Sequence, residues 1–312
     1  MDARERLDPS LLERARPTIR AAAAMMLMAV VGLWASSALV ARLLPGERAA
    51  QEFLFVAAYY LPFVALPVAL YARRRPGLSA ALRLKPMPGL STLAVVFAAA
   101  LCVYLASAAN GLWAVLLDAL GLREPDVSVD IAGSGGLSLA ILYSAAMPAI
   151  FEELLCRGVV FSAFESRGTW RALWMSSAMF ALMHGNLYGL PAYTLVGAVS
   201  AFLVFSLDSL YAGITFHTVY NSLILILIYL TPAAGDAAPA MNARMLTGVA
   251  VDVLTFALLL WLTLRLLDRR RRARGIAPVP HVRQPLRKSE WALLAALGVV
   301  FAATNALVLA GG

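Results

Sequence analysis

The sequence predicts an all-α fold, a polytopic transmembrane helical bundle of about nine spans, with eight as the lower count. Of the 312 residues, 61% are apolar and only 14% are charged, whereas soluble domains are about half apolar. Apolar runs of about 20 residues, the length that crosses about 30 Å of hydrocarbon, recur along the whole chain. These runs leave no stretch long enough for a separate soluble domain.

The expected spans follow the apolar runs in chain order. They cover about residues 21–43, 52–71, 90–117, 137–164, 172–187, 189–206, 209–231, 245–267 and 290–310. The first run follows a charged stretch, residues 1–20, and is longer than the apolar core of a signal peptide. We therefore expect a retained membrane anchor, with 1–20 as a cytoplasmic N-terminal segment and 21–312 as one transmembrane helical domain.

Basic residues are distributed unevenly between the two sides of the expected membrane. The side of the N-terminus carries five before Ala21, five in 71–89, two at Arg167 and Arg171, and nine from Arg265 to Lys288. The other side carries four: Arg42, Arg48, Arg123 and Arg244. Because Lys and Arg accumulate in cytoplasmic loops, the N-terminus is expected in the cytoplasm.

The net charge of +8 then belongs to membrane-edge clusters such as 269–274, so the expected partner is the lipid bilayer and not a nucleic acid. Arginine is much commoner than lysine in the chain, which favours a bacterial source and hence the bacterial inner membrane. Cys102 and Cys156 both fall in spans, where a thiol is typically a small hydrophobe and forms neither a disulfide nor a metal site.

Few polar or ionisable side chains fall inside the expected spans, where each charge costs about 2.5 to 3.5 kcal/mol. Residues four apart share a helix face, whereas adjacent residues diverge by about 100°. Glu153 should therefore pair with Arg157, which leaves Glu152 as an unpaired carboxylate able to act as a general base. The candidates in the fourth, fifth and seventh spans are Glu152, Glu153, Arg157, His184, His217 and Asn221.

The candidates are also expected at similar depths in the membrane. At 1.5 Å per residue, Glu152, His184 and His217 lie about 18, 20 and 12 Å from the cytoplasmic ends of their spans. Together they supply a base for water, a second group to hold that water, and donors for an oxyanion, which are the parts of a hydrolytic site. The same residues would also serve as a proton relay in a transporter, and the residues alone leave that alternative open.

Three short motifs carry a resemblance to a known family. EExxxR at Glu152 to Arg157, FxxxH at Phe180 to His184 and HxxxN at His217 to Asn221 occur in this order on three apolar segments. This set resembles the CPBP family, also called the Abi or CAAX protease and bacteriocin-processing family. The resemblance covers about 137–231, which we take as the catalytic core.

The resemblance implies a membrane-embedded, glutamate-type endopeptidase that cleaves a membrane-associated or lipidated protein or peptide. It implies no metal and no cofactor, with a zinc-dependent membrane protease as an alternative, since glutamate and histidine also bind zinc. Family substrates include prenylated C-termini, bacteriocins and C-terminal sorting signals, and the sequence does not choose among them. The implied roles are water activation by Glu152 with His184, oxyanion stabilisation by His217 with Asn221, and a supporting ion pair of Glu153 with Arg157.

Overall fold

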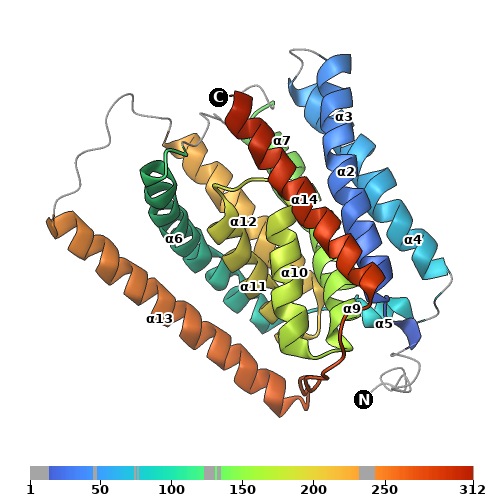
Figure 1. The fold of residues 1–312 in the computed structure, drawn as a ribbon. Helices are drawn as coiled ribbons and strands as arrows, with labels where there is room; N and C mark the ends of the chain where they lie inside the picture. Colours follow the sequence, from blue (N-terminus) through green and yellow to red (C-terminus); the bar gives the residue numbers. More distant parts are fainter. Residues whose placement is uncertain are drawn as a thin grey trace.

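The computed structural model describes residues 14–44, 48–73, 75, 77–122, 131, 135–231 and 243–311. Every regular element in this part of the chain is a helix (Figure 1), as the apolar runs predict. Three π-helical segments, labelled η, interrupt two of the helices. The elements are α2 (Ile19–Leu43), α3 (Arg48–Tyr60), η1 (Leu61–Ala65), α4 (Leu66–Arg73), α5 (Leu78–Ala81), α6 (Gly89–Ala119), α7 (Leu137–Ile141), η2 (Leu142–Ala146), α8 (Met147–Glu153), η3 (Leu154–Val160), α9 (Phe161–Glu165), α10 (Thr169–Met183), α11 (Leu190–Leu207), α12 (Leu210–Leu230), α13 (Ala243–Ala273) and α14 (Lys288–Gly311).

Eight helical stretches among the described residues are long and apolar enough to cross a membrane, which confirms the predicted bundle at its lower count. The chain is therefore an integral, multi-pass membrane protein. The eight stretches are α2, α3 to α4, α6, α7 to α9, α11, α12, α13 and α14.

The fifth expected span, 172–187, begins three residues earlier and ends four residues earlier than predicted. Its helix, α10, has 15 residues, about 22 Å of helix, which falls short of the hydrocarbon thickness. Gly185 ends it, because its left-handed backbone (φ +62°) turns the chain and its N–H bonds to the carbonyl of Leu182 at 3.1 Å. His184 is the C-terminal cap of α10, and its helical backbone (φ −70°, ψ −17°) keeps its side chain on the same face as Phe180.

Two of the π-helical segments have a proline as their cause. η1 is followed by Pro67, and η2 by Pro148, in each case two residues after the segment ends. A proline ring lacks an N–H and clashes with the carbonyl four residues earlier, and a widened turn accommodates both defects. The span from α7 to α9 thus crosses the membrane without a break and carries α8 with both glutamates at its centre.

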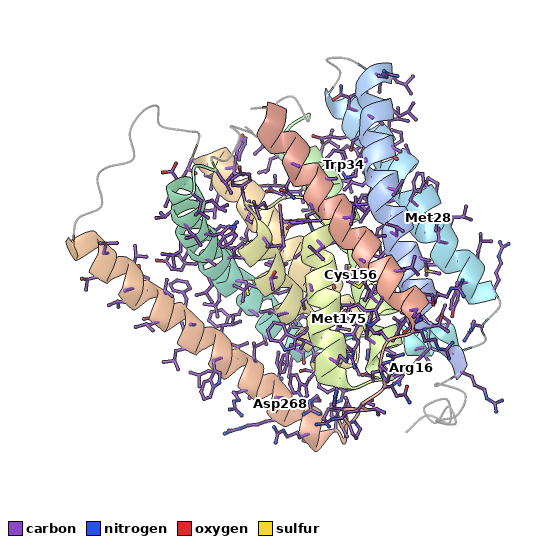
Figure 2. All side chains as sticks on the ribbon, viewed as in Figure 1. Arg16, Met28, Trp34, Cys156, Met175 and Asp268 are labelled. Atoms are coloured by element: carbon purple, nitrogen blue, oxygen red, sulfur yellow. The ribbon has the colours of Figure 1, made fainter. Side chains whose placement is uncertain are left out.

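The eight stretches and the shorter α10 run in alternating directions along the chain, so the start of α2 and the end of α14 lie at opposite ends of the bundle (Figure 1). α10 and α11 pack together at the centre, α6 covers α11 and α12, α13 packs on α6, and α14 packs on α2. Figure 2 places Arg16 and Asp268 at the end where α2 begins, and Cys156 in the interior. We call that end the basic end and the opposite one the distal end.

Candidate active site

Glu152 is in the last turn of α8 and 8% exposed. Its Oε1 accepts a hydrogen bond from the hydroxyl of Tyr60 at 3.0 Å. Tyr60 is held in place by its stacking on Phe151, with ring centroids 5.0 Å apart. The other oxygen, Oε2, is buried and has no hydrogen-bond partner among the described residues, and it lies 3.8 Å from Nε2 of His184.

His184 is oriented by its neighbours. Its Nδ1 lies 2.7 Å from the carbonyl oxygen of Phe180. Because a carbonyl only accepts, Nδ1 carries the proton, and in the neutral ring Nε2 is the acceptor that faces Glu152. The ring stacks on Tyr193 at 4.0 Å and meets Phe180 edge-on at 4.8 Å, the contact that the FxxxH spacing predicts.

Glu153 points away from Glu152 and is fully buried in a set of donors. Its Oε1 accepts from Nη1 of Arg157 at 2.8 Å, which is the ion pair expected from the spacing. The same oxygen lies 3.2 Å from Nδ1 of His217, and Oε2 accepts from the Ser200 hydroxyl at 2.6 Å. One carboxylate therefore joins three helical segments, η3, α11 and α12.

Arg157 is also fully buried, and the protein surrounds its guanidinium on several sides. Its Nη2 donates to the carbonyl of Gly197 at 2.8 Å, and the guanidinium lies 4.4 Å from the ring centre of Phe180. A ring face attracts a cation. Phe180 thus contacts Arg157 on one side and the imidazoles of His184 and His217 on others, with 5.4 Å between its ring and that of His217.

Two glycines let the neighbouring helices approach this ion pair. A Cβ on Gly213 of α12 would lie 2.5 Å from Oε2 of Glu153, and one on Gly197 of α11 would lie 3.3 Å from Nη2 of Arg157. The first distance is a clash, since real Cβ atoms do not come that close. Glycine at 213 therefore lets α12, which carries His217 and Asn221, approach the ion pair without displacing the Glu153 side chain.

A cavity of about 420 Å³ connects the candidate residues. Glu152, His184, His217 and Asn221 all line it, together with Tyr60 and mainly apolar and aromatic side chains. The structure thus brings together the four predicted catalytic candidates in one hollow, with the Glu153 and Arg157 pair directly behind His217. Among the described residues, no three His, Cys, Asp or Glu side chains come together as a potential metal-ion site.

Polar neighbours of the site that were not predicted include Tyr60, Tyr193, Ser200, Glu52 and Ser144. The hydrogen-bond partner is remote in the sequence, 92 residues away for Tyr60 and 47 for Ser200. No short spacing marks such a residue. The buried Cys156 is a free thiol whose Sγ lies 3.6 Å from Sδ of Met183, and it is not part of the described cavity wall.

Comparison with known proteins gives a match, which lies in the same part of the chain. The family model described as type II CAAX prenyl endopeptidase Rce1-like matches residues 134–223. The matched range runs through α7 to most of α12 and includes all six predicted site residues. Comparisons with curated proteins and with solved structures give no match. The chain is therefore a multi-pass membrane protein whose residues 134–223 are similar to the CPBP or CAAX protease family of membrane-embedded endopeptidases.

Proposed function

We propose that the protein hydrolyses a peptide bond in a membrane-associated protein or peptide through a water molecule activated by Glu152 and His184. The observation that carries the proposal is the 3.8 Å between Oε2 of Glu152 and Nε2 of His184 at the cavity wall. Both atoms accept hydrogen bonds, so a water between them can donate one hydrogen to each and direct a lone pair into the cavity. Glu152 then takes a proton as the water attacks the carbonyl carbon.

The developing oxyanion is stabilised by His217 and Asn221, which share a face of α12 and both line the cavity. Because Nδ1 of His217 is engaged with the Glu153 carboxylate at 3.2 Å, Nε2 donates a hydrogen bond only when the ring carries both protons. The carboxylate stabilises that cation, as a buried acid does for an imidazolium in other hydrolases. The Asn221 amide supplies a second donor without any change of protonation.

Collapse of the tetrahedral intermediate completes the reaction. The bond between the carbonyl carbon and the amide nitrogen breaks, Glu152 returns its proton to the leaving amine, and the products are a carboxylate and an amine. In the described part of the chain, Arg157 is not one of the residues that line the cavity. It acts through Glu153, which it holds in the orientation that His217 requires.

We also propose that the basic end faces the cytoplasm, in the inner membrane of a bacterium. Arginines at this end include Arg16, Arg83 and Arg167, while few basic positions lie near the distal end. The positive-inside rule assigns such an end to the cytoplasm.

The proposal is tested by Glu152→Gln, which keeps the shape of the side chain and removes the base. The N-termini and C-termini of membrane and secreted proteins should be mapped in cells that carry wild type, Glu152→Gln or the control Asp252→Asn. Asp252 is an exposed carboxylate on α13 that accepts from Tyr104 and lies outside the cavity wall. We expect the same cleavages to disappear in Glu152→Gln and to persist in Asp252→Asn; cleavage by purified Glu152→Gln at the wild-type rate would defeat the assignment.

A zinc-activated water is the alternative chemistry for the same residues, and it is tested directly. If Glu152 is the base, the purified enzyme should keep its turnover after exhaustive treatment with a strong chelator. One zinc per chain, with a chelator-induced loss of cleavage that zinc restores, would support the metal mechanism and leave the position of the site unchanged.

A further inference from the structure

From the catalytic candidates, the active-site cavity extends toward the distal end of the bundle and not toward the basic end. Its wall uses residues from five helical stretches, and in each stretch they come from the half nearer the distal end or from its middle. Glu52 is four residues after the start of α3, and Ile228 is two residues before the end of α12. The catalytic candidates Glu152 and His217 form its floor near mid-membrane.

Between the cavity and the basic end, side chains fill the interior of the bundle. Along the fourth span toward the basic end, Arg157, Phe161 and Phe164 are all fully buried. Beyond them the Glu165 carboxylate accepts from Nη2 of Arg83 at 2.7 Å, and Arg83 also contacts Asp208 at 3.2 Å. Packed rings and a charge cluster therefore separate the described cavity from the basic end.

Taken with the proposed orientation, this geometry points to a substrate class. We infer that the cavity is reached from the extracytoplasmic side, so that the scissile bond belongs to a peptide segment exposed at or just within the outer leaflet. The inference rests on the proposed function. A cytoplasmic C-terminal tail, such as a prenylated one, would meet the closed end of the bundle instead.

The test is thiol labelling in a Cys102→Ala, Cys156→Ala background, because both native thiols are buried. Ser144→Cys places a thiol of nearly the same size on the cavity wall, about 10 Å from the start of α7. Ser289→Cys is the matched control, an exposed serine at the basic end. A membrane-impermeant maleimide is applied to right-side-out and to inverted vesicles, with Ile228→Cys as a second reporter nearer the opening.

We expect Ser144→Cys and Ile228→Cys to be labelled in right-side-out vesicles, and Ser289→Cys in inverted vesicles alone. Labelling of the cavity thiols in inverted vesicles alone, or in neither preparation, would overturn the inference. The result is independent of proteolysis. If Glu152→Gln is inactive but the cavity thiols are labelled from the cytoplasmic side, the proposed function stands and the inferred access does not. If the thiols are labelled from the extracytoplasmic side but Glu152→Gln is active, the inferred access stands and the proposed function does not.

A second, separate observation concerns the basic end. A pocket of about 460 Å³ lies between the segment before α2, the turn from α9 to α10 and the segment before α14. Glu290 is the one acidic side chain in its wall among the described residues. Six arginines line it: Arg14, Arg16, Arg20, Arg75, Arg167 and Arg287.

Three of these arginines form an ion pair or a hydrogen bond with another group of the protein, and three do not. Arg16 pairs with Glu165 at 3.2 Å, Arg167 with Glu290 at 3.3 Å, and Arg75 donates to the carbonyl of Arg14 at 2.7 Å. The guanidinium groups of the remaining three have no acceptor among the described residues, and two helices, α2 and α14, begin at this wall with the positive ends of their dipoles. The unpaired three are Arg14, Arg20 and Arg287.

The three unpaired arginines are exposed and carry charge of one sign around a single pocket, which attracts anions, and arginine forks match the oxygens of a phosphate group. We propose that this arginine pocket binds a phosphate-bearing anion, supplied either by the headgroup of an anionic phospholipid or by free phosphate. Basic pockets at the cytoplasmic ends of membrane spans are suited to lipid headgroups.

Thermal unfolding of the purified protein in an uncharged detergent tests this pocket. Short-chain phosphatidylglycerol, short-chain phosphatidylcholine and inorganic phosphate are compared for wild type, Arg14→Gln with Arg287→Gln, and the control Arg269→Gln with Arg270→Gln. We expect phosphatidylglycerol or phosphate to raise the Tm of wild type and control but not of the pocket variant. A rise with phosphatidylglycerol alone identifies a lipid site, and a rise with both identifies a phosphate site. An unchanged wild-type Tm, or an equal rise in the pocket variant, would refute the proposal.

Discussion

At the scale of single residues, the two adjacent glutamates have different surroundings and therefore different proposed roles. Glu153 receives donors from Arg157, Ser200 and His217 and is fully buried, so it is fixed as a structural anion. Glu152 receives one hydroxyl, from Tyr60, and its second oxygen faces His184. A carboxylate with a free lone pair beside an imidazole is suited to take a proton, whereas one surrounded by donors is not.

Replacing Tyr60 by phenylalanine should lower turnover without unfolding the protein. A hydrogen bond to a charged group contributes about 1.5 to 3 kcal/mol, so we expect kcat to fall by roughly 10- to 150-fold as Glu152 loses its orientation. Tyr59→Phe is the matched control, because the Tyr59 hydroxyl is buried without a hydrogen-bond partner in the described part of the chain. Kinetics of both variants on one peptide substrate check the prediction, and equal losses would contradict it.

Asn221→Ala should remove one of the two proposed oxyanion donors. Loss of such a donor costs about 10²- to 10³-fold in kcat, with little change in KM, because the interaction forms in the transition state. Ser222→Ala, one position further along α12 and outside the cavity wall, is the control. Steady-state kinetics separate the two parameters; a rise in KM at constant kcat would indicate that Asn221 binds substrate instead.

At the scale of helices, the site depends on how closely α12 approaches η3 and α11. The approach is set by glycine at 213, since a Cβ there would meet both Glu153 and the Ser200 hydroxyl at 2.5 and 2.9 Å. Helical periodicity explains the contacts within one helix, such as Glu153 with Arg157. Contacts between helices instead depend on which small residues lie at the crossing points.

Gly213→Ala should therefore displace α12 and lower both stability and activity. Overpacking of this kind costs about 1 to 3 kcal/mol, and the shift should also weaken the His217 contact with Glu153. Gly111→Ala on α6 is the control, because a Cβ there meets no heavy atom within 4 Å. Thermal unfolding and turnover are measured on both; a Gly213→Ala protein as stable and active as wild type would show that the helices can adjust.

At the scale of the whole molecule, a charge cluster holds the basic end together. Glu165 joins Arg83, which precedes α6, to Arg16, which precedes α2, and Arg83 also reaches Asp208 between α11 and α12. Burial lowers the pKa of Arg83, but the Glu165 and Asp208 carboxylates outweigh it, so the pKa is raised and the guanidinium stays charged. The cluster therefore ties together segments from four parts of the chain.

Arg83→Ala should destabilise the fold while leaving the catalytic residues in place. Removing one partner of a buried ion pair costs about 3 to 5 kcal/mol, and we expect a loss toward the lower end of this range because Arg16 still pairs with Glu165 at 3.2 Å. Arg272→Ala is the control, since its guanidinium is 68% exposed beside Asp268 and such pairs contribute about 0 to 1 kcal/mol. We expect a clear drop in Tm for Arg83→Ala alone, with kcat below the transition near that of wild type; equal Tm values would contradict the role of the cluster.

The sequence by itself determined the features that depend on local periodicity and hydropathy. Apolar length predicted the membrane spans, and the four-residue helical repeat predicted that Glu153 meets Arg157 and that Phe180 meets His184. Local sequence also contains the reason that α10 ends earlier than predicted, since Gly185 permits a left-handed backbone. The apolar run did not predict this end of α10, because hydropathy gives the extent of the apolar residues and not the residue at which the backbone turns.

Only the tertiary structure decided which spans meet and where the hollow between them lies. It paired His217 with Glu153, set Tyr60 against Glu152 across 92 residues, and placed the cavity toward the distal end. The physical reason is that contacts between helices arise from the summed packing of many side chains and from close approaches at glycines such as Gly213. A short motif fixes neither quantity, so the sequence named the four candidates that line the cavity, while their hydrogen-bond partners and the direction in which the cavity extends came from the tertiary structure.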